Sequence, residues 1–175
     1  MRRLILLRHS KAERSQPGER DIDRALTARG REDAARIGAY IASHSLTPDR
    51  VLVSPSSRTQ ETWKCVSGAL RPAPGAATAE RLYNATSHTI FALIKDVQAS
   101  AHSVLLVGHN PGLHELALML IASGDIEARE QLAEKLPTSG LVIVDFAIDA
   151  WARLHPHSGR LERFVAPKSL DTGHW

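Results

Sequence analysis

The stretch Leu4-Ile5-Leu6-Leu7-Arg8-His9-Ser10 decides the fold, because four apolar residues run without interruption into a polar turn. A short apolar run of this kind is typical of a strand buried on both faces of a parallel sheet. The pattern returns at 51–53, which leads into Ser54, and at 104–107, which leads into Gly108. Three buried strands that end in polar turns therefore organise the chain.

Amphipathic segments alternate with these strands. Thr27, Ser54 and Asn110 can each cap a helix, and proline directly after Ser54 and Asn110 favours a helix start at those points. The alternation predicts a three-layer α/β/α sandwich with a mostly parallel central sheet and one antiparallel edge. We expect helices at 27–41, 54–70, 86–100 and 110–120, strands at 76–79 and 141–148, and a terminal hairpin from 151–154 and 161–165.

The composition is that of one domain of ordinary size. The chain has 175 residues, of which 43% are hydrophobic, and we expect a single domain over 1–175 with a loosely held tail at 167–175. No stretch reaches the roughly 20 apolar residues of a membrane span, and the apolar run after Arg3 is too short for a secretory signal. A single cysteine, Cys65, fits a reducing compartment, so we expect the cytoplasm.

Basic residues are scattered along the chain. The formal net charge is +3, but the lysines and arginines do not form the dense, aromatic-interleaved patch that is typical of nucleic-acid-binding proteins. We therefore expect no nucleic acid and no membrane among the partners. A mildly basic surface is compatible with an anionic substrate.

Cationic side chains follow all three buried strands. Arg8 and His9 come after the first strand, Arg58 soon after the second, and His109 directly after the third. In an open α/β sheet, ligands bind beyond the carboxyl ends of the parallel strands, so these side chains are expected to line one pocket. Arginine forks match phosphate oxygens, and a neutral imidazole can attack phosphorus. The sequence therefore predicts a site for a tetrahedral dianion, with arginine clamps and a histidine nucleophile.

Metal chemistry has little support in the sequence. His155 and His157 have no acidic or cysteine partner nearby. Asp21 and Asp23 lack a third carboxylate at ligand spacing, and we expect them either to cap or to pair with the flanking Arg20 and Arg24. No metal and no organic cofactor is expected.

Four motifs resemble those of the histidine phosphatase superfamily, the phosphoglycerate-mutase-like phosphatases, and occur in the family's order. The segment LILLRHSKAE at 4–13 is similar to the family's first strand and catalytic loop. Residues 23–30 resemble its D-x-x-L-T-x-x-G helix entry, and residues 54–62 its S-x-x-x-R-x-x-x-T segment. Residues 108–112, Gly-His-Asn-Pro-Gly, resemble its second-histidine loop. The resemblance extends from Arg2 to about Leu120.

The short chain, Arg-His-Ser-Lys-Ala and Gly-His-Asn-Pro-Gly together resemble the SixA-type phosphohistidine phosphatases. This resemblance implies a phosphoglycerate-mutase-like fold and a metal-independent phosphatase whose nucleophile, His9, becomes phosphorylated. It also implies that Arg8, Arg58 and His109 complete the phosphate pocket, with the backbone of Asn110 as a further donor. The implied substrate is phosphohistidine on a signalling protein, such as a phosphotransfer domain.

Two positions depart from the pattern of the superfamily. Ser10 stands where glycine is usual, which fits the SixA-type subgroup, and it is expected to lie in the substrate-binding loop. Glu80 resembles the acid that larger relatives carry before an aromatic residue, although a polar residue beside a strand would look the same. An alkoxide leaving group needs a proton near pH 7, whereas phosphohistidine needs less help from an acid. An enzyme without the acid would favour phosphoramidates.

Three alternatives remain open at this stage. A small-molecule phosphatase or mutase would use the same chemistry on a phosphate ester. A non-catalytic phosphate-binding module would use the same pocket without turnover. A metal-dependent hydrolase would lose its activity in chelator. The sequence leaves the oligomeric state undetermined.

Overall fold

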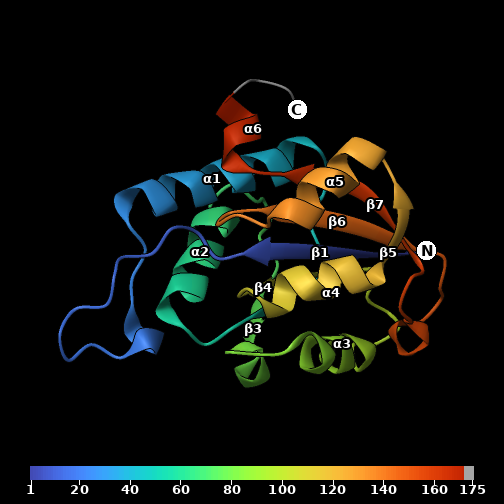
Figure 1. Ribbon diagram of the computed structural model, residues 1–175, viewed down its shortest axis with the longest axis horizontal. Coiled ribbons are helices and arrows are strands. Elements are labelled where there is room, and N and C mark those ends of the chain that lie inside the picture. The colour runs from blue at the N-terminus through green and yellow to red at the C-terminus, as the bar shows by residue number, and fades with distance from the viewer. Residues whose placement is uncertain (172–175) are drawn as a thin grey trace.

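The structure is a computed structural model that describes residues 1–171, and it has one seven-stranded sheet covered by helices on both faces (Figure 1). The strand order is β3-β2-β4-β1-β6-β7-β5. The strands are β1 (Arg2–Arg8), β2 (Arg50–Val53), β3 (Ala76–Thr78), β4 (Ser103–Gly108), β5 (Ile121–Gly124), β6 (Leu141–Phe146) and β7 (Gly159–Val165). The helices are α1 (Ala28–Ser43), α2 (Ser57–Ser67), α3 (Ser87–Lys95), α4 (Gly112–Leu120), α5 (Ile126–Glu134) and α6 (Pro167–Asp171). The α/β sandwich expected from the sequence is confirmed.

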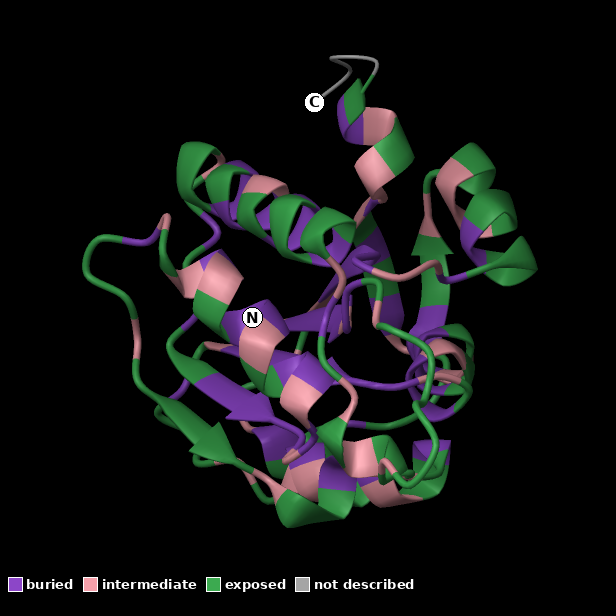
Figure 2. Cartoon of the chain, turned by 90° about the vertical axis from the view of Figure 1, so that its left-hand side faces the viewer, coloured by how far each residue is buried: buried purple, intermediate pink, exposed green. Residues whose placement is uncertain are grey.

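Alternate residues of the strands pack into two separate cores. Leu4 and Leu6 of β1 face the core under α3, α4 and α5, whereas Ile5 and Leu7 face the core under α1, α2 and α6. The central strands and the inward faces of the helices are buried, whereas the edge strand β3 and the outer faces of the helices are exposed (Figure 2). Because side chains alternate along a strand, an uninterrupted apolar run was the correct signal for a strand covered on both faces.

The antiparallel strand lies inside the sheet, so its expected position at an edge is wrong. β6 pairs antiparallel with β1 on one side and with β7 on the other. The edge strands are β3 and β5, which pair parallel with β2 and β7. The first four residues of β6 are all fully buried, and this apolar content suits a central position.

Two helices begin later than the capping signals predict. The cap of α2 is Ser56, whose hydroxyl accepts from the backbone of Thr59, while Ser54 directs its hydroxyl to a histidine of the site. The helix α4 begins at Gly112, because the Asn110 amide donates to a backbone carbonyl instead of capping. Ser54 and Asn110 therefore form tertiary hydrogen bonds instead of capping the helices that follow them.

The chain after α4 departs most from the expectation. The segment after Leu120 continues as β5 and α5, which the sequence reading missed. The expected terminal hairpin is wrong. Residues 151–153 form a 3-10 turn, in which the Trp151 indole donates a hydrogen bond to the carbonyl of Ala101. The strand β7 pairs instead with β6 and β5. Residues 167–171, expected as part of a loose tail, form α6, which buries Leu170. The last four residues of that tail lie outside the described residues.

Within residues 1–171, no helix combines the length and the hydropathy that a bilayer crossing requires.

Candidate active site

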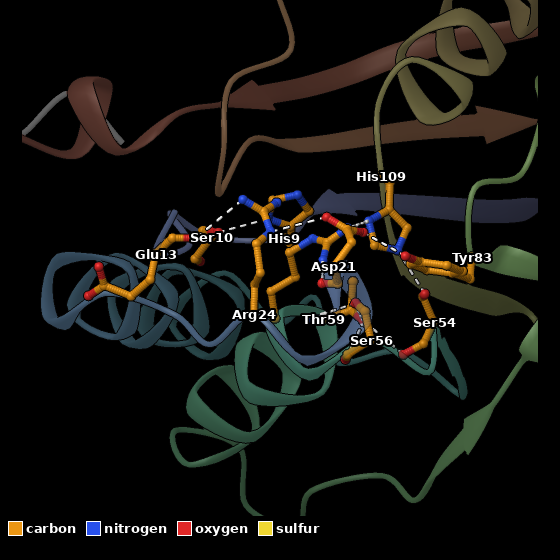
Figure 3. Close-up of polar contacts among 11 residues, drawn as sticks. His9, Ser10, Glu13, Asp21, Arg24, Ser54, Ser56, Thr59, Tyr83 and His109 are labelled. Atoms are coloured by element: carbon orange, nitrogen blue, oxygen red, sulfur yellow. Dashed lines mark hydrogen bonds and ion pairs between the residues drawn. The ribbon is translucent and has the colours of Figure 1, made fainter. Parts of the chain in front are cut away.

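Strand register brings the two histidines of the motifs together. Arg8 of β1 lies opposite Gly108 of β4, so His9 and His109 leave the sheet side by side at its carboxyl edge. Their ring centroids are 5.4 Å apart, with a 56° angle between the rings (Figure 3). Arg58 reaches the same place from the first turn of α2. The four side chains that the sequence placed in one pocket do converge there.

His9 has a defined tautomer. Its Nδ1 lies 2.8 Å from the carbonyl oxygen of Ser10, and a carbonyl oxygen can only accept, so Nδ1 carries the proton. The Nε2 atom consequently keeps its lone pair. Burial, together with the positive charges of Arg58, Arg8 and Arg24, lowers the pKa of His9 to about 4, although the bond to Ser10 acts in the opposite direction. His9 is thus neutral at physiological pH.

His109 is fixed from two sides. Its Nδ1 lies 3.4 Å from Nη2 of Arg58, which can only donate, so Nε2 carries the proton and donates to the Ser54 hydroxyl at 2.7 Å. Burial, followed by the charges of His9 and Arg58, lowers the pKa of His109 to about 3, while Asp21 opposes that shift. The second histidine is therefore also neutral, and it accepts on the side of the arginine.

Three arginines bring donors to the site. The Nε atoms of Arg8, Arg24 and Arg58 are buried, and each lacks a hydrogen-bond partner among the described residues, although that of Arg24 lies 3.1 Å from Oδ1 of Asp21 in an ion pair. Buried N–H groups normally have a partner, and an arginine N–H suits the oxygens of a phosphate. Burial also lowers the pKa of Arg8. A phosphoryl group bound here would satisfy donors that the protein leaves unpaired.

The turn before β6 supports this arrangement from the backbone. The carbonyl of Leu136 accepts from Nη1 of Arg8 at 3.1 Å and from the side-chain amide of Asn110 at 2.9 Å. The hydroxyl of Ser10 contacts that of Ser139, and the backbone N–H of Ser10 donates to Thr62. Ser10 is fully buried, so its observed contribution to the pocket is the carbonyl that orients His9.

Sequence reasoning missed three residues of the site, Asp21, Arg24 and Tyr83. Asp21 accepts from Arg58 through its backbone carbonyl at 2.8 Å and through Oδ2 at 3.0 Å. Tyr83 donates its hydroxyl to the same Oδ2 at 2.6 Å, and its ring meets His109 edge to face. The expected pairing of the aspartates with flanking arginines is confirmed, since Asp21 pairs with Arg24 and Asp23 pairs with Arg20. The additional partner of Asp21, Arg58, came from outside the loop.

Glu80 lies apart from these contacts. It is exposed at the start of the 3-10 turn η2 (Glu80–Leu82), whereas Tyr83, the residue directly after that turn, reaches the site. Among the described residues, no three histidine, cysteine, aspartate or glutamate side chains are arranged to hold a metal ion.

Comparison with known proteins places this geometry in context. The sequence model of the histidine phosphatase superfamily (branch 1) matches residues 4–86, which include the first three motifs. An uncharacterised protein of Mycobacterium tuberculosis (strain CDC 1551 / Oshkosh) is 33% identical over 164 residues, which cover 93% of this chain and 100% of that protein.

Solved structures share both the fold and the extent of the chain. An Agrobacterium tumefaciens protein, provisionally assigned as the phosphohistidine phosphatase SixA, matches with a TM-score of 0.81 and 33% identity, over 95% of this chain and 98% of its own. The protein histidine phosphatase SixA complexed with tungstate matches with a TM-score of 0.77 and 20% identity, over 96% of this chain and 99% of its own. At that lower identity the likeness concerns the fold.

Proposed function

This chain belongs to the histidine phosphatase superfamily and is a hydrolytic phosphatase, and we propose that His9 is its nucleophile and phosphohistidine on a signalling protein its substrate. The observation that carries the proposal is the tautomer of His9: Nδ1 is held by the carbonyl of Ser10, which leaves the Nε2 lone pair free in a site where the charges of Arg8 and Arg58 also act. A neutral imidazole at physiological pH is a competent nucleophile.

The first step transfers the phosphoryl group to His9. The Nε2 lone pair attacks phosphorus, a P–N bond forms, and the bond to the leaving group breaks with its electron pair on that group. Arg8 and Arg58 bind the oxygens on which charge is spread. The dianion also favours protonation of the neighbouring His109 at Nδ1, which would then donate to a phosphate oxygen. The backbone N–H of Asn110 is a further proposed donor.

The second step releases inorganic phosphate. Water attacks phosphorus, its proton passes to solvent or to the product phosphate, and the P–N bond breaks with its electron pair returned to Nε2. No step requires a metal ion. The buried contact between Nδ1 and Ser10 persists through both steps, and so keeps the ring oriented for the next attack.

The proposed substrate class follows from the question of which residue could protonate the leaving group. Glu80 is exposed in η2, apart from the hydrogen bonds that join the site residues, so we do not assign it as the acid that an alkoxide leaving group would need. A phosphoramidate such as phosphohistidine has a leaving nitrogen that needs less protonation than an alkoxide does. The resemblance to SixA-type proteins points to the same substrate class, with the cytoplasm as the proposed compartment. A small phosphate ester is the alternative substrate.

The test compares wild type with His9→Ala in the presence of chelator, on p-nitrophenyl phosphate and on a histidine peptide phosphorylated with phosphoramidate. We expect His9→Ala to lose roughly a thousandfold in turnover of both substrates. Radiolabelled substrate should leave an acid-labile phosphoryl group on the wild-type protein alone. His114→Ala is the matched control, because a ring nitrogen of His114 also contacts a backbone carbonyl, but His114 is only half-buried and lies outside the site.

Several outcomes would overturn the proposal. Full activity in His9→Ala, or loss of wild-type activity in chelator, would remove the nucleophile from the mechanism. Turnover of sugar phosphates with none of the phosphohistidine peptide would replace the substrate class by that of a small-molecule phosphatase. Exchange of label between phosphorylated and free sugar would indicate a mutase, and orthovanadate binding without turnover a binding module.

A further inference from the structure

Asp21 is a carboxylate in the anion site for which the proposed mechanism gives no role. It lies in the 3-10 turn η1 (Asp21–Asp23) of the loop between β1 and α1, and it reaches Arg58, Arg24 and Tyr83 (Figure 3). A negative charge in a pocket built for a dianion opposes binding of that dianion. Its position therefore calls for a function beyond holding phosphate.

The two oxygens of Asp21 are engaged to different extents. Oδ2 accepts from Tyr83 at 2.6 Å and from Arg58 at 3.0 Å. Oδ1 lies 3.1 Å from Nε of Arg24, but that ion pair does not have hydrogen-bond geometry, since this Nε lacks a hydrogen-bond partner. Oδ1 therefore retains capacity to accept. The bond from Tyr83 lowers the pKa of Asp21, so the carboxylate is ionised at neutral pH.

Asp21 is far more exposed to solvent than the two histidines of the site. The side chain of Asp21 is 51% exposed, whereas His9 is 8% exposed and His109 is 7% exposed. In an in-line displacement the leaving group departs on the side opposite the nucleophile. Because His9 is buried and attacks from inside the protein, we expect the leaving group to depart toward solvent, where the exposed Asp21 side chain can meet it.

We propose that Asp21 is a specificity-determining residue, whose carboxylate accepts the free ring N–H of a phosphohistidine leaving group and disfavours leaving groups that carry negative charge. This inference rests on the proposed function, and it identifies the free ring N–H of the leaving group as the feature of the substrate that the site recognises.

The chemistry balances without an acid at the bond that breaks. One ring nitrogen of phosphohistidine carries the phosphoryl group, and the other, when protonated, presents an N–H and makes the ring an imidazolium. When His9 attacks, the P–N bond of the substrate breaks and its electron pair goes to the ring, which leaves as neutral imidazole. A carboxylate bonded to the distal N–H stabilises the imidazolium, the form that leaves more easily.

Phosphate esters gain nothing from this carboxylate. An alkoxide needs a proton on the oxygen that departs, and an ionised Asp21 has none to give. A carrier with its own carboxylate, such as phosphoglycerate, is repelled by Asp21 at close range. The residue should therefore separate substrates by the charge and the donors of the leaving group.

The test is Asp21→Asn, with Asp23→Asn as the matched control. Asp23 lies in the same turn and pairs with Arg20, at the exposed surface. Three substrates are compared by kcat/KM: the phosphohistidine peptide, p-nitrophenyl phosphate and 3-phosphoglycerate. We expect Asp21→Asn to lower the value for the peptide at least about tenfold relative to p-nitrophenyl phosphate, and to raise the value for phosphoglycerate. Asp23→Asn should keep the wild-type ratios.

Each other outcome has a distinct meaning. If Asp21→Asn lowers all three values equally, Asp21 only positions Arg58, and the inference fails. Unchanged ratios between substrates would also overturn it. If wild type does not turn over the phosphohistidine peptide at all, the proposed function itself has failed, and that result is read from the wild-type arm alone.

Discussion

Two buried neutral histidines make the stability of this protein sensitive to mild acid. His9 and His109 have pKa values of about 4 and about 3 in the folded protein, against 6.5 for an unperturbed histidine. Between pH 6.5 and these values, the unfolded chain binds protons at both positions and the folded chain does not. The free energy of unfolding therefore falls as the pH falls. The contribution of His9 begins near pH 6.5 and is complete near pH 4.

The loss in the free energy of unfolding can be calculated at pH 5, where both histidines are still neutral in the folded state. The interval from 6.5 to 5 is about 1.5 pH units, and at 1.36 kcal/mol per pH unit each histidine destabilises the fold by about 2 kcal/mol. Burial is the first cause for both groups, so each shift belongs to the folded pocket. Wild type should thus lose about 4 kcal/mol through this pair alone.

The assay is urea unfolding at pH 7 and pH 5 for wild type, His9→Asn and His114→Asn. Carboxylates contribute equally to all three proteins, so the comparison between variants isolates the histidine. We expect His9→Asn to lose about 2 kcal/mol less than wild type between the two pH values, because it lacks one group that protonates on unfolding. An identical loss in wild type and His9→Asn would refute the reasoning, since it would mean that His9 already binds its proton in the folded state.

Two further changes test the arginine clamp and the entry to α1. Arg58→Lys keeps the charge but loses the planar guanidinium group that donates to Asp21 and lies beside His109. We therefore expect kcat/KM to fall about ten- to a hundredfold and orthovanadate to bind more weakly. An orthovanadate affinity equal to that of wild type would contradict this expectation. Gly30→Ala would bring a Cβ against the carbonyl of Lys11, and we expect it to lower the free energy of unfolding by about 1–3 kcal/mol at pH 7, whereas Gly75→Ala, with open space around it, should leave stability nearly unchanged.

The motif at 23–30 illustrates how a local signal has a tertiary cause. Thr27 caps α1 by accepting from the backbone of Gly30 at 2.9 Å, which the sequence predicts. The glycine itself is required by the close approach of Lys11, whose carbonyl occupies the space of a side chain. The same carbonyl accepts from the backbone of Thr27 at 2.9 Å. The loop and the helix entry are therefore fitted to one another.

The sequence by itself predicted that two arginines and two histidines meet in one site, although it did not identify Arg24. Strand identity follows from apolar runs, and the residues after parallel strands share an edge, so Arg8, His9 and His109 were brought together by local pattern and one topological rule. Arg58 followed from the start of the helix after β2, even though the exact first residue was wrong. The apolar runs and helix starts can be recognised in the sequence because each depends on only a few neighbouring residues.

Only the tertiary structure decided the electrostatics of the pocket. The partners that set them are far apart in the chain: Asp21 lies 37 residues from Arg58 and 62 from Tyr83, and the carbonyl that holds Arg8 is 128 residues away at Leu136. The charge states depend on burial and on such distant partners, and no spacing in the sequence encodes either. The carbonyl of the adjacent Ser10 sets the tautomer of His9, but the burial that keeps His9 neutral and the placement of Asp21 exist only once the loops have packed.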